Sequence, residues 1–136
     1  MIKKIQKFFT FRIIIFVLIA FTQNVAAENW VKFGENESGE TTNYIEVDSI
    51  KVRDGFTYYW LLSDRKTATS TGSKSRKAYY KLDCDFNRQM LITVSFYSEN
   101  MGSGTVKSFE PSSKWEYPIP GSLGGETFNF VCFYDK

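Results

Sequence analysis

The sequence of 136 residues contains no histidine and only two cysteines. The lack of histidine removes the usual activating base of serine and cysteine nucleophiles, and it removes histidine-ligated metal sites. Two cysteines do not complete a structural zinc site, which takes four Cys or His ligands. We therefore expect no catalytic residues, no metal site and no cofactor, and we predict that the chain is not an enzyme.

Paired carboxylates, another common source of catalytic groups, occur at Asp83 and Asp85. Two residues apart on a strand, they share one face and lie roughly 7 Å apart. Pairs with this spacing are common on outward faces, where they aid solubility and oppose edge pairing. We expect both carboxylates to face solvent without a catalytic role.

Long hydrophobic runs are also scarce. The run Ile13–Phe21 has nine residues, whereas a membrane-spanning helix needs about 20. It follows a basic segment without acids and precedes the small residues around Val25 and Ala27, which is the pattern of a signal peptide. We predict a signal peptide over residues 1–27 that is cleaved after Ala27, rather than a retained membrane anchor.

Cleavage after Ala27 leaves a single domain, residues 28–136, with 13 basic and 15 acidic residues and hence a net charge of −2. This balance gives no support to nucleic-acid binding. No cysteine near the cleavage site could carry a lipid anchor. We therefore expect an exported protein, periplasmic or secreted, with no membrane span after signal cleavage.

Short alternating segments fill this domain and predict antiparallel β-strands. Apolar and aromatic residues alternate through Phe56–Ser63, and Asp54-Gly55 just before it predicts a two-residue hairpin turn. The same period occurs in residues 43–50 and 78–86, and one further apolar row is formed by Met90, Ile92, Val94 and Phe96. Residues 29–33 are predicted as the first strand.

The two cysteines bear on both compartment and architecture. Cys84 falls on the apolar side of the hairpin predicted over residues 78–96, and Cys132 lies four residues from the end of the sequence. In an exported protein, an even pair of inward-facing cysteines most simply forms a disulfide. We predict a Cys84–Cys132 bridge rather than two packed thiols.

The segment that contains Cys132 fits two kinds of secondary structure. With a period of two it is a strand whose one face carries Phe128, Phe130, Cys132 and Tyr134. With a period of 3.6 it is a helix that begins after Ser122 as N-cap and presents Gly124, Phe128, Val131 and Cys132 on one face. Periodicity leaves both structures open.

Several motifs follow one another along the domain: YIEVDSI at 44–50, YYWLLSD at 58–64, KLDC at 81–84, WEYPIPGS at 115–122 and the closing Val131-Cys132. In this order they resemble the bacterial surface-adhesin protein E family. The resemblance implies an α+β fold, with an antiparallel sheet of about six strands and a C-terminal helix tied to it by the disulfide. It also implies a non-enzymatic binding module, because the name-giving members are outer-membrane lipoproteins that bind extracellular-matrix proteins, notably vitronectin and laminin.

No matched motif carries a known binding residue, so candidate binding residues come from charge. The polar segment 64–77 has five basic residues and one acid, which predicts a cationic patch for an acidic protein partner. The residues of this predicted patch are Arg65, Lys66, Lys74, Arg76 and Lys77.

An alternative function uses the aromatic residues. A periplasmic carrier of a small apolar ligand could line a concave sheet face with Tyr58, Trp60 and Tyr97. We expect instead that these three side chains are core residues beneath the C-terminal segment.

Overall fold

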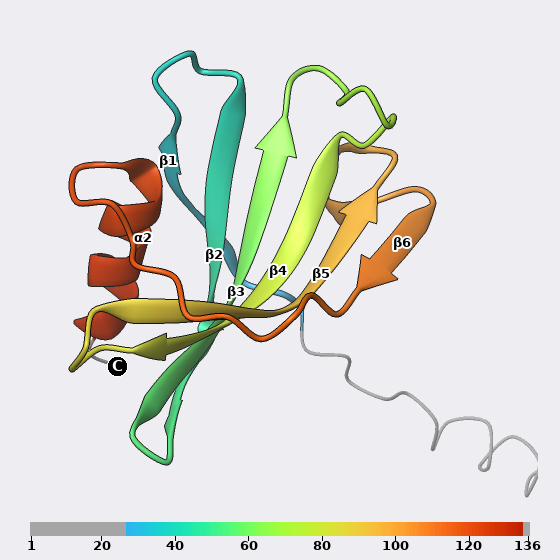
Figure 1. Cartoon of the computed structure of the whole chain (residues 1–136). Coiled ribbons are helices and arrows are strands. Elements are labelled where there is room, and N and C mark those ends of the chain that lie inside the picture. Colours follow the sequence, from blue (N-terminus) through green and yellow to red (C-terminus); the bar gives the residue numbers. More distant parts are fainter. Residues whose placement is uncertain (1–26, 135–136) are drawn as a thin grey trace, which may run out of the picture.

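Six strands form one antiparallel sheet in which every strand pairs with its neighbours in sequence, in the order β1 to β6 (Figure 1). The computed structural model describes residues 27–134, so the predicted signal peptide lies outside the described residues except for Ala27. The strands are β1 (Trp30–Glu35), β2 (Thr41–Arg53), β3 (Phe56–Arg65), β4 (Ser75–Asp83), β5 (Arg88–Tyr97) and β6 (Val106–Phe109). A 3₁₀ turn, η1 (Asn100–Gly102), precedes β6, and the helix α2 (Leu123–Cys132) follows it.

The predicted hairpin between β2 and β3 is confirmed. Asp54 and Gly55 have φ angles of 51° and 79°, as a two-residue turn that matches the twist of its strands requires. From this turn, β2 and β3 pair outward to Thr41 and Arg65. The turn therefore sets the register next to it, from Arg53↔Phe56 to Lys51↔Tyr58, and an irregularity between Glu46 and Lys51 shifts the register for the rest of the two strands.

One face of the sheet carries the core. Ile45, Leu61, Ala78 and Val94 are cross-strand neighbours on β2 to β5, and all four are buried. The helix α2 adds Phe128 and Val131 to the same cluster, which also holds Val47, Ile50, Tyr59, Tyr80 and Leu82. Figure 1 shows α2 beside β1 and β2, reached by a linker that runs back from β6. The linker forms a single bridge with β5, between Glu116 and Gln89.

The apolar row predicted over residues 90–96 is interrupted by an irregularity in the pairing of β4 with β5. Tyr79 pairs with Thr93, whereas the next residue, Tyr80, pairs with Leu91, so Ile92 is an extra residue on β5. An extra residue reverses the alternation of faces. Leu91 therefore packs against the core in place of Met90.

The helical alternative for the C-terminal segment is correct. Ser122 caps α2 by accepting a hydrogen bond from the Gly125 amide through its hydroxyl oxygen, at 3.1 Å. The predicted Cys84–Cys132 disulfide is present, with the two Cα atoms 5.8 Å apart. Cys84 is half-buried and lies in the turn just after β4, so the bridge fastens the end of α2 to the β4–β5 turn.

The expectation that Asp83 faces solvent is wrong. Asp83 is 6% exposed, and its carboxylate accepts a hydrogen bond from Arg88 Nε at 2.9 Å and pairs with the same guanidinium through Nη2. These two residues face each other across the β4–β5 hairpin, where Asp83 pairs with Arg88 in the ladder. Asp85, in the turn, is exposed. The two carboxylates thus serve different purposes, and Asp83 is a structural ion-pair partner.

The burial of Tyr59 leads us to predict a loss of stability at alkaline pH. Its ring is 2% exposed and stacks on Tyr80, and burial raises the pKa of both phenols above their usual value. Above about pH 10 these tyrosines ionise in the unfolded chain but stay protonated in the folded one. The free energy of unfolding should then fall with rising pH, by up to about 1.4 kcal/mol per pH unit for each such group.

Denaturant unfolding between pH 8 and about 11 measures this effect. Tyr59→Phe should reduce the alkaline slope, because one of the two groups that ionise only on unfolding is gone while Tyr80 remains. Tyr117→Phe, which changes a tyrosine that is 70% exposed, should leave the slope as it is. Equal slopes in all three proteins would show that burial of Tyr59 does not govern the alkaline limit.

Candidate functional site

The five cations predicted to form one patch are divided between different parts of the molecule. Arg65 ends β3, Lys66 and Lys74 flank the β3–β4 loop, and Arg76 and Lys77 belong to β4 itself. Because consecutive strand residues point to opposite faces, Arg76 lies on the face covered by α2 and Lys77 on the other. The segment therefore contributes to two separate surfaces, which we call the cleft and the open face.

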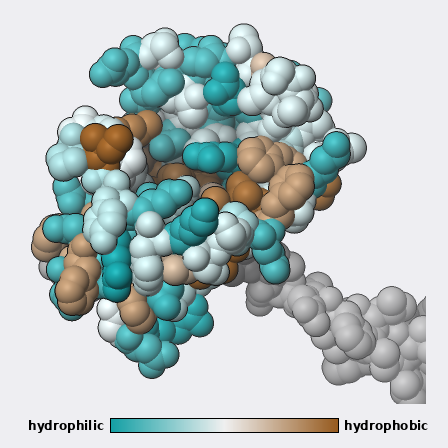
Figure 2. Space-filling model, in the orientation of Figure 1, coloured by the Kyte–Doolittle hydropathy of each residue, from teal (hydrophilic) through white to brown (hydrophobic). Residues whose placement is uncertain are grey.

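The cleft lies on the α2 side of the sheet, next to the core row. A second row of cross-strand neighbours runs from Asn43 through Ser63 and Arg76 to Phe96. These residues, together with Arg65 and the helix residue Leu123, line a cavity of about 380 Å³. Figure 2 shows hydrophobic residues gathered in the middle of this side of the molecule, with hydrophilic residues around them.

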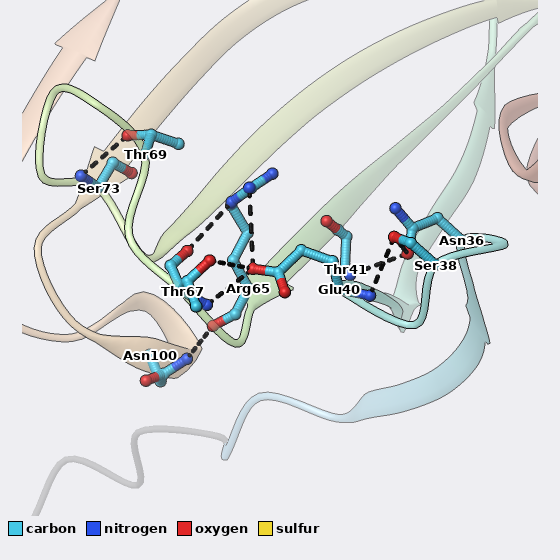
Figure 3. A network of polar contacts seen from close by, with 9 residues as sticks. All are labelled: Asn36, Ser38, Glu40, Thr41, Arg65, Thr67, Thr69, Ser73 and Asn100. Carbon is cyan, nitrogen blue, oxygen red and sulfur yellow. Dashed lines mark hydrogen bonds and ion pairs between the residues drawn. The ribbon is translucent and has the colours of Figure 1, made fainter.

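A polar network closes one rim of the cleft and joins the β1–β2 turn to the β3–β4 loop (Figure 3). Glu40 accepts hydrogen bonds from the Thr67 amide, at 2.8 Å, and from the Thr67 hydroxyl, and its carboxylate lies 3.8 Å from Arg65. The Thr67 bonds, then the nearby cations Arg65 and Lys66, lower the pKa of Glu40. On the same rim, Asn100 donates to the Arg65 carbonyl at 2.8 Å. Both loops are thus held in place around the cleft.

The open face is the side of the sheet away from α2, and aromatic rings alternate with cations along it. At its centre Trp60 stacks on Tyr79 with ring centroids 4.9 Å apart, and Tyr79 stacks on Tyr58 at 5.9 Å. The Arg53 guanidinium lies 4.4 Å from the centre of the Tyr58 ring. These rings are only half-buried, so cations and stacked aromatics are presented to solvent together.

The same pattern continues toward the linker. The Lys81 ammonium lies 3.8 Å from the centre of the Phe56 ring, and Phe56 stacks on Trp115 of the linker at 6.0 Å. The Arg88 guanidinium covers the other end of this group, 4.4 Å from the centre of Trp115. The linker therefore extends the open face beyond the strands.

At the β1 end of the open face, the Lys77 ammonium lies between two aromatic rings, 5.3 Å from Trp30 and 5.9 Å from Tyr97. The Glu28 carboxylate accepts hydrogen bonds from Trp30 Nε1, at 2.6 Å, and from Lys77 Nζ, at 2.9 Å. These two bonds, the Trp30 bond first, lower the pKa of Glu28. A cavity of about 490 Å³ lies here, and Trp60 is among its lining residues.

The expectation that Tyr58, Trp60 and Tyr97 are core residues beneath the tail is therefore wrong. Tyr59 and Leu61, their alternates on β3, carry the core instead. The aromatic face that the carrier hypothesis used does exist, but the cavity on it is lined by Glu28, Glu46, Asp48 and Lys77 as well as by rings. Its charged lining suits a polar partner better than a small apolar ligand.

Sequence reasoning missed the contributions of Tyr79, Lys81 and Trp115 to the open face, and of Asn43 and Phe96 to the cleft. The alternation of Lys77, Tyr79 and Lys81 along β4 was the available signal, since residues two apart share a face. Trp115 could not be placed in this way, because it lies in the linker and reaches the sheet only through the tertiary fold.

Two further findings concern the described residues. Residues 27–134 hold no cluster of three or more His, Cys, Asp or Glu side chains placed to bind a metal ion. Within the same range, α2 is too short to cross a membrane, and no other helix is long and apolar enough to do so.

Comparison with known proteins identifies the class. The sequence profile of the family described as surface-adhesin protein E matches residues 30–133, and the chain belongs to this family. Crystal form II of Haemophilus influenzae protein E superposes with a TM-score of 0.59 at 14% identity, covering 81% of this chain and 91% of that chain. The selenomethionine form of the same protein gives a TM-score of 0.59 at 15% identity, covering 81% of this chain and 90% of that chain.

Protein E from non-typeable Haemophilus influenzae gives a TM-score of 0.51 at 17% identity, covering 78% of this chain and 85% of that chain. At such identities the likeness establishes the fold alone. No curated protein matches the sequence. The family and the fold make the chain a surface-adhesin-like binding module, and the open face and the cleft are its candidate binding surfaces.

Proposed function

We propose that the chain is exported by a signal peptide cleaved after Ala27 and acts as a non-enzymatic module that binds extracellular proteins through the open face. The observation that carries this proposal is the array of half-exposed aromatic rings and cations on the side of the sheet that α2 leaves uncovered. If the signal peptide is cleaved after Ala27, the mature protein begins with Glu28. N-terminal sequencing of the chain from the periplasm or medium tests this, and recovery of an uncleaved chain in the inner membrane would contradict it.

The composition of the open face is that of a binding surface. Trp, Tyr and Arg are enriched among the residues that contribute most to protein–protein affinity, because they supply large contact areas and hydrogen bonds. Here the stacked pairs Trp60–Tyr79 and Tyr79–Tyr58 hold their rings in place before any partner arrives. A preorganised surface loses less side-chain freedom on binding.

The part of the open face around Arg53 and Lys81 indicates an acidic partner segment, whereas the cavity beside Lys77 also carries the carboxylates Glu28, Glu46 and Asp48. Arg53 and Lys81 are placed over rings, and no carboxylate forms an ion pair with either of them among residues 27–134. Lys77, from the predicted cationic segment, adds a third cation, although Glu28 holds it. Positive surfaces of this kind favour acidic partners and speed encounter with them. By family resemblance, the partners are of the extracellular-matrix type, such as vitronectin and laminin.

Trp60→Ala should weaken binding to immobilised vitronectin or laminin by at least about tenfold, because truncation of a central aromatic at an interface typically costs more than 1–2 kcal/mol. Lys81→Glu, which reverses a half-buried charge outside the core cluster, should weaken it as well. Phe133→Ala serves as the matched control, because Phe133 is an aromatic residue, 82% exposed, just beyond α2.

Biolayer interferometry gives the affinities, and thermal melting shows whether each variant is folded. Binding that survives both open-face changes would remove the open face from the interface. No binding by the wild-type protein to any tested matrix protein would contradict the proposed partner class.

A further inference from the structure

Arg76 occupies an unusual position in the cleft. It lies in the middle strands of the sheet, between Ser63 on β3 and Phe96 on β5, and its side chain points to the side covered by α2. Among residues 27–134 no carboxylate forms an ion pair with it, and its one side-chain hydrogen bond, from Nε to Ser63 Oγ, is long at 3.4 Å. A guanidinium has five N–H donors, so most of its donors have no protein acceptor here.

Asn43 is a second polar group in the cleft without a partner. It is 8% exposed, and it belongs to the same cross-strand row as Ser63 and Arg76. Its carboxamide makes no hydrogen bond to any residue of the described range 27–134. Because no fully buried side-chain nitrogen or oxygen of that range lacks a partner, the carboxamide atoms open onto the cavity and are free to bind a ligand there. Both groups line the same cavity of about 380 Å³, a volume within the range of about 300–1,000 Å³ usual for small-ligand sites.

The other lining residues limit the chemistry of the ligand: they comprise two apolar side chains, a second guanidinium, and the polar side chains of Asn36, Thr41, Thr69, Ser73 and Ser75. Phe96 and Leu123 form apolar walls on opposite sides of the cleft, one from β5 and one from the first turn of α2. Arg65 adds a second guanidinium at the rim. Its Nη2 atom lies 3.8 Å from the Glu40 carboxylate, which is a long distance for an ion pair. The cleft thus combines two guanidinium groups and several hydroxyl and amide side chains with two apolar contact residues, Phe96 and Leu123.

We propose that the cleft is a binding site for a carboxylate carried on a short apolar chain. The Arg76 guanidinium donates to both carboxylate oxygens, because its planar fork matches the geometry of a carboxylate. The Asn43 amide donates a further hydrogen bond, and the apolar chain packs between Phe96 and Leu123. A free aliphatic acid and the C-terminal residue of a peptide share this chemistry.

This site lies on the opposite side of the sheet from the open face, so it does not depend on the proposed protein-binding function. Trp60→Ala, which disables the open face in that proposal, leaves ligand binding in the cleft unchanged. The two proposals can therefore fail separately.

Amide NMR spectra of the purified protein, titrated with hexanoate up to about 50 mM, test the site, because that concentration saturates a site with a dissociation constant near 1 mM. Hexanoate shifts the signals of Ser63, Arg76 and Phe96. Hexanamide, which has the same chain without the charge, binds at least about tenfold more weakly, because charge-assisted hydrogen bonds are about twice as strong as neutral ones. A peptide that ends in a free leucine carboxylate, compared with its C-terminal amide, shows whether a chain terminus also enters.

Arg76→Gln keeps a hydrogen-bonding side chain but removes the charge, and it lowers the affinity for hexanoate at least about tenfold. Lys114→Gln, the matched control, removes one positive charge from an exposed position in the linker and leaves the affinity unchanged. Equal affinities in these two variants, or equal affinities for hexanoate and hexanamide, would overturn the proposal. Tighter binding of inorganic phosphate than of hexanoate would also overturn it, and so would a folded protein with no shifts in the cleft.

Discussion

Replacing Cys132 by serine should lower the free energy of unfolding by about 2–5 kcal/mol, the usual cost of losing a native disulfide in a small domain. The bridge joins residues 48 apart in sequence, and in the chain-entropy model a loop of this length restricts the unfolded chain by roughly 4 kcal/mol. Domains of this size are stable by only about 5–15 kcal/mol. The bridge therefore supplies a large share of the free energy of unfolding.

The position of the bridge in the fold adds to this effect. Cys132 ends α2, and the helix contributes Phe128 and Val131 to the core. Without the covalent link, the helix is attached to the sheet only through its packing and the linker. For a domain of about 100 residues, each kcal/mol lost from the free energy of unfolding lowers the melting temperature by about 4–8 °C. We therefore expect a large drop in the melting temperature of Cys132→Ser.

Urea unfolding of the wild-type protein, the wild-type protein under reducing conditions and Cys132→Ser gives the comparison. The reduced wild type and the variant should be destabilised alike, since both lack the bridge and keep the rest of the core. A loss below about 1 kcal/mol in both would contradict the assigned role of the bridge.

Two neighbouring glycines in α2 should respond to alanine in opposite directions. A Cβ at Gly125 would lie 2.2 Å from the Ile119 carbonyl oxygen, a backbone atom of the linker, so the helix or the linker must move. Overpacking of this kind typically costs about 1–3 kcal/mol. A Cβ at Gly124 would meet nothing closer than the Ser122 hydroxyl, at 3.8 Å.

Gly124 is exposed and lies within the helix. Gly124→Ala should therefore stabilise the protein by about 0.5–1 kcal/mol through helix propensity. Thermal melting of the two variants measures the difference, and each variant is the control for the other, because the same methyl group is added one residue apart. Equal effects of the two changes would mean that α2 does not pack on the linker through Gly125.

Most of the sheet followed from local pattern. Alternation in Phe56–Ser63 and the Asp54-Gly55 turn predicted β2 and β3 correctly, because both signals act over a few residues. The extra residue at Ile92 could not be seen in this way, since a bulge depends on how two strands pair. The choice between strand and helix for the C-terminal segment needed the family resemblance, because its apolar residues fit both periods.

The candidate site was predicted only in part, and for a related reason. The charge of segment 64–77 identifies Arg76 and Lys77 as notable, but charge alone does not show that β4 begins at Ser75 and includes both residues. Once both residues belong to a strand, they must face opposite sides of the sheet. The alternation of side chains along a strand also does not show which face of the sheet the helix covers. For this reason the sequence predicts Trp60 in the core instead of on the open face.

The central claim is that the open face binds the protein partner. Hydroxyl-radical footprinting of the chain, free and bound to vitronectin or laminin, tests it directly, because aromatic side chains are labelled in proportion to their exposure. Binding through the open face predicts reduced labelling of Trp60, Tyr58 and Tyr79 in the complex, with Phe133 labelled as in the free protein. Protection of Phe133 with unchanged labelling of the open-face aromatics would contradict the claim.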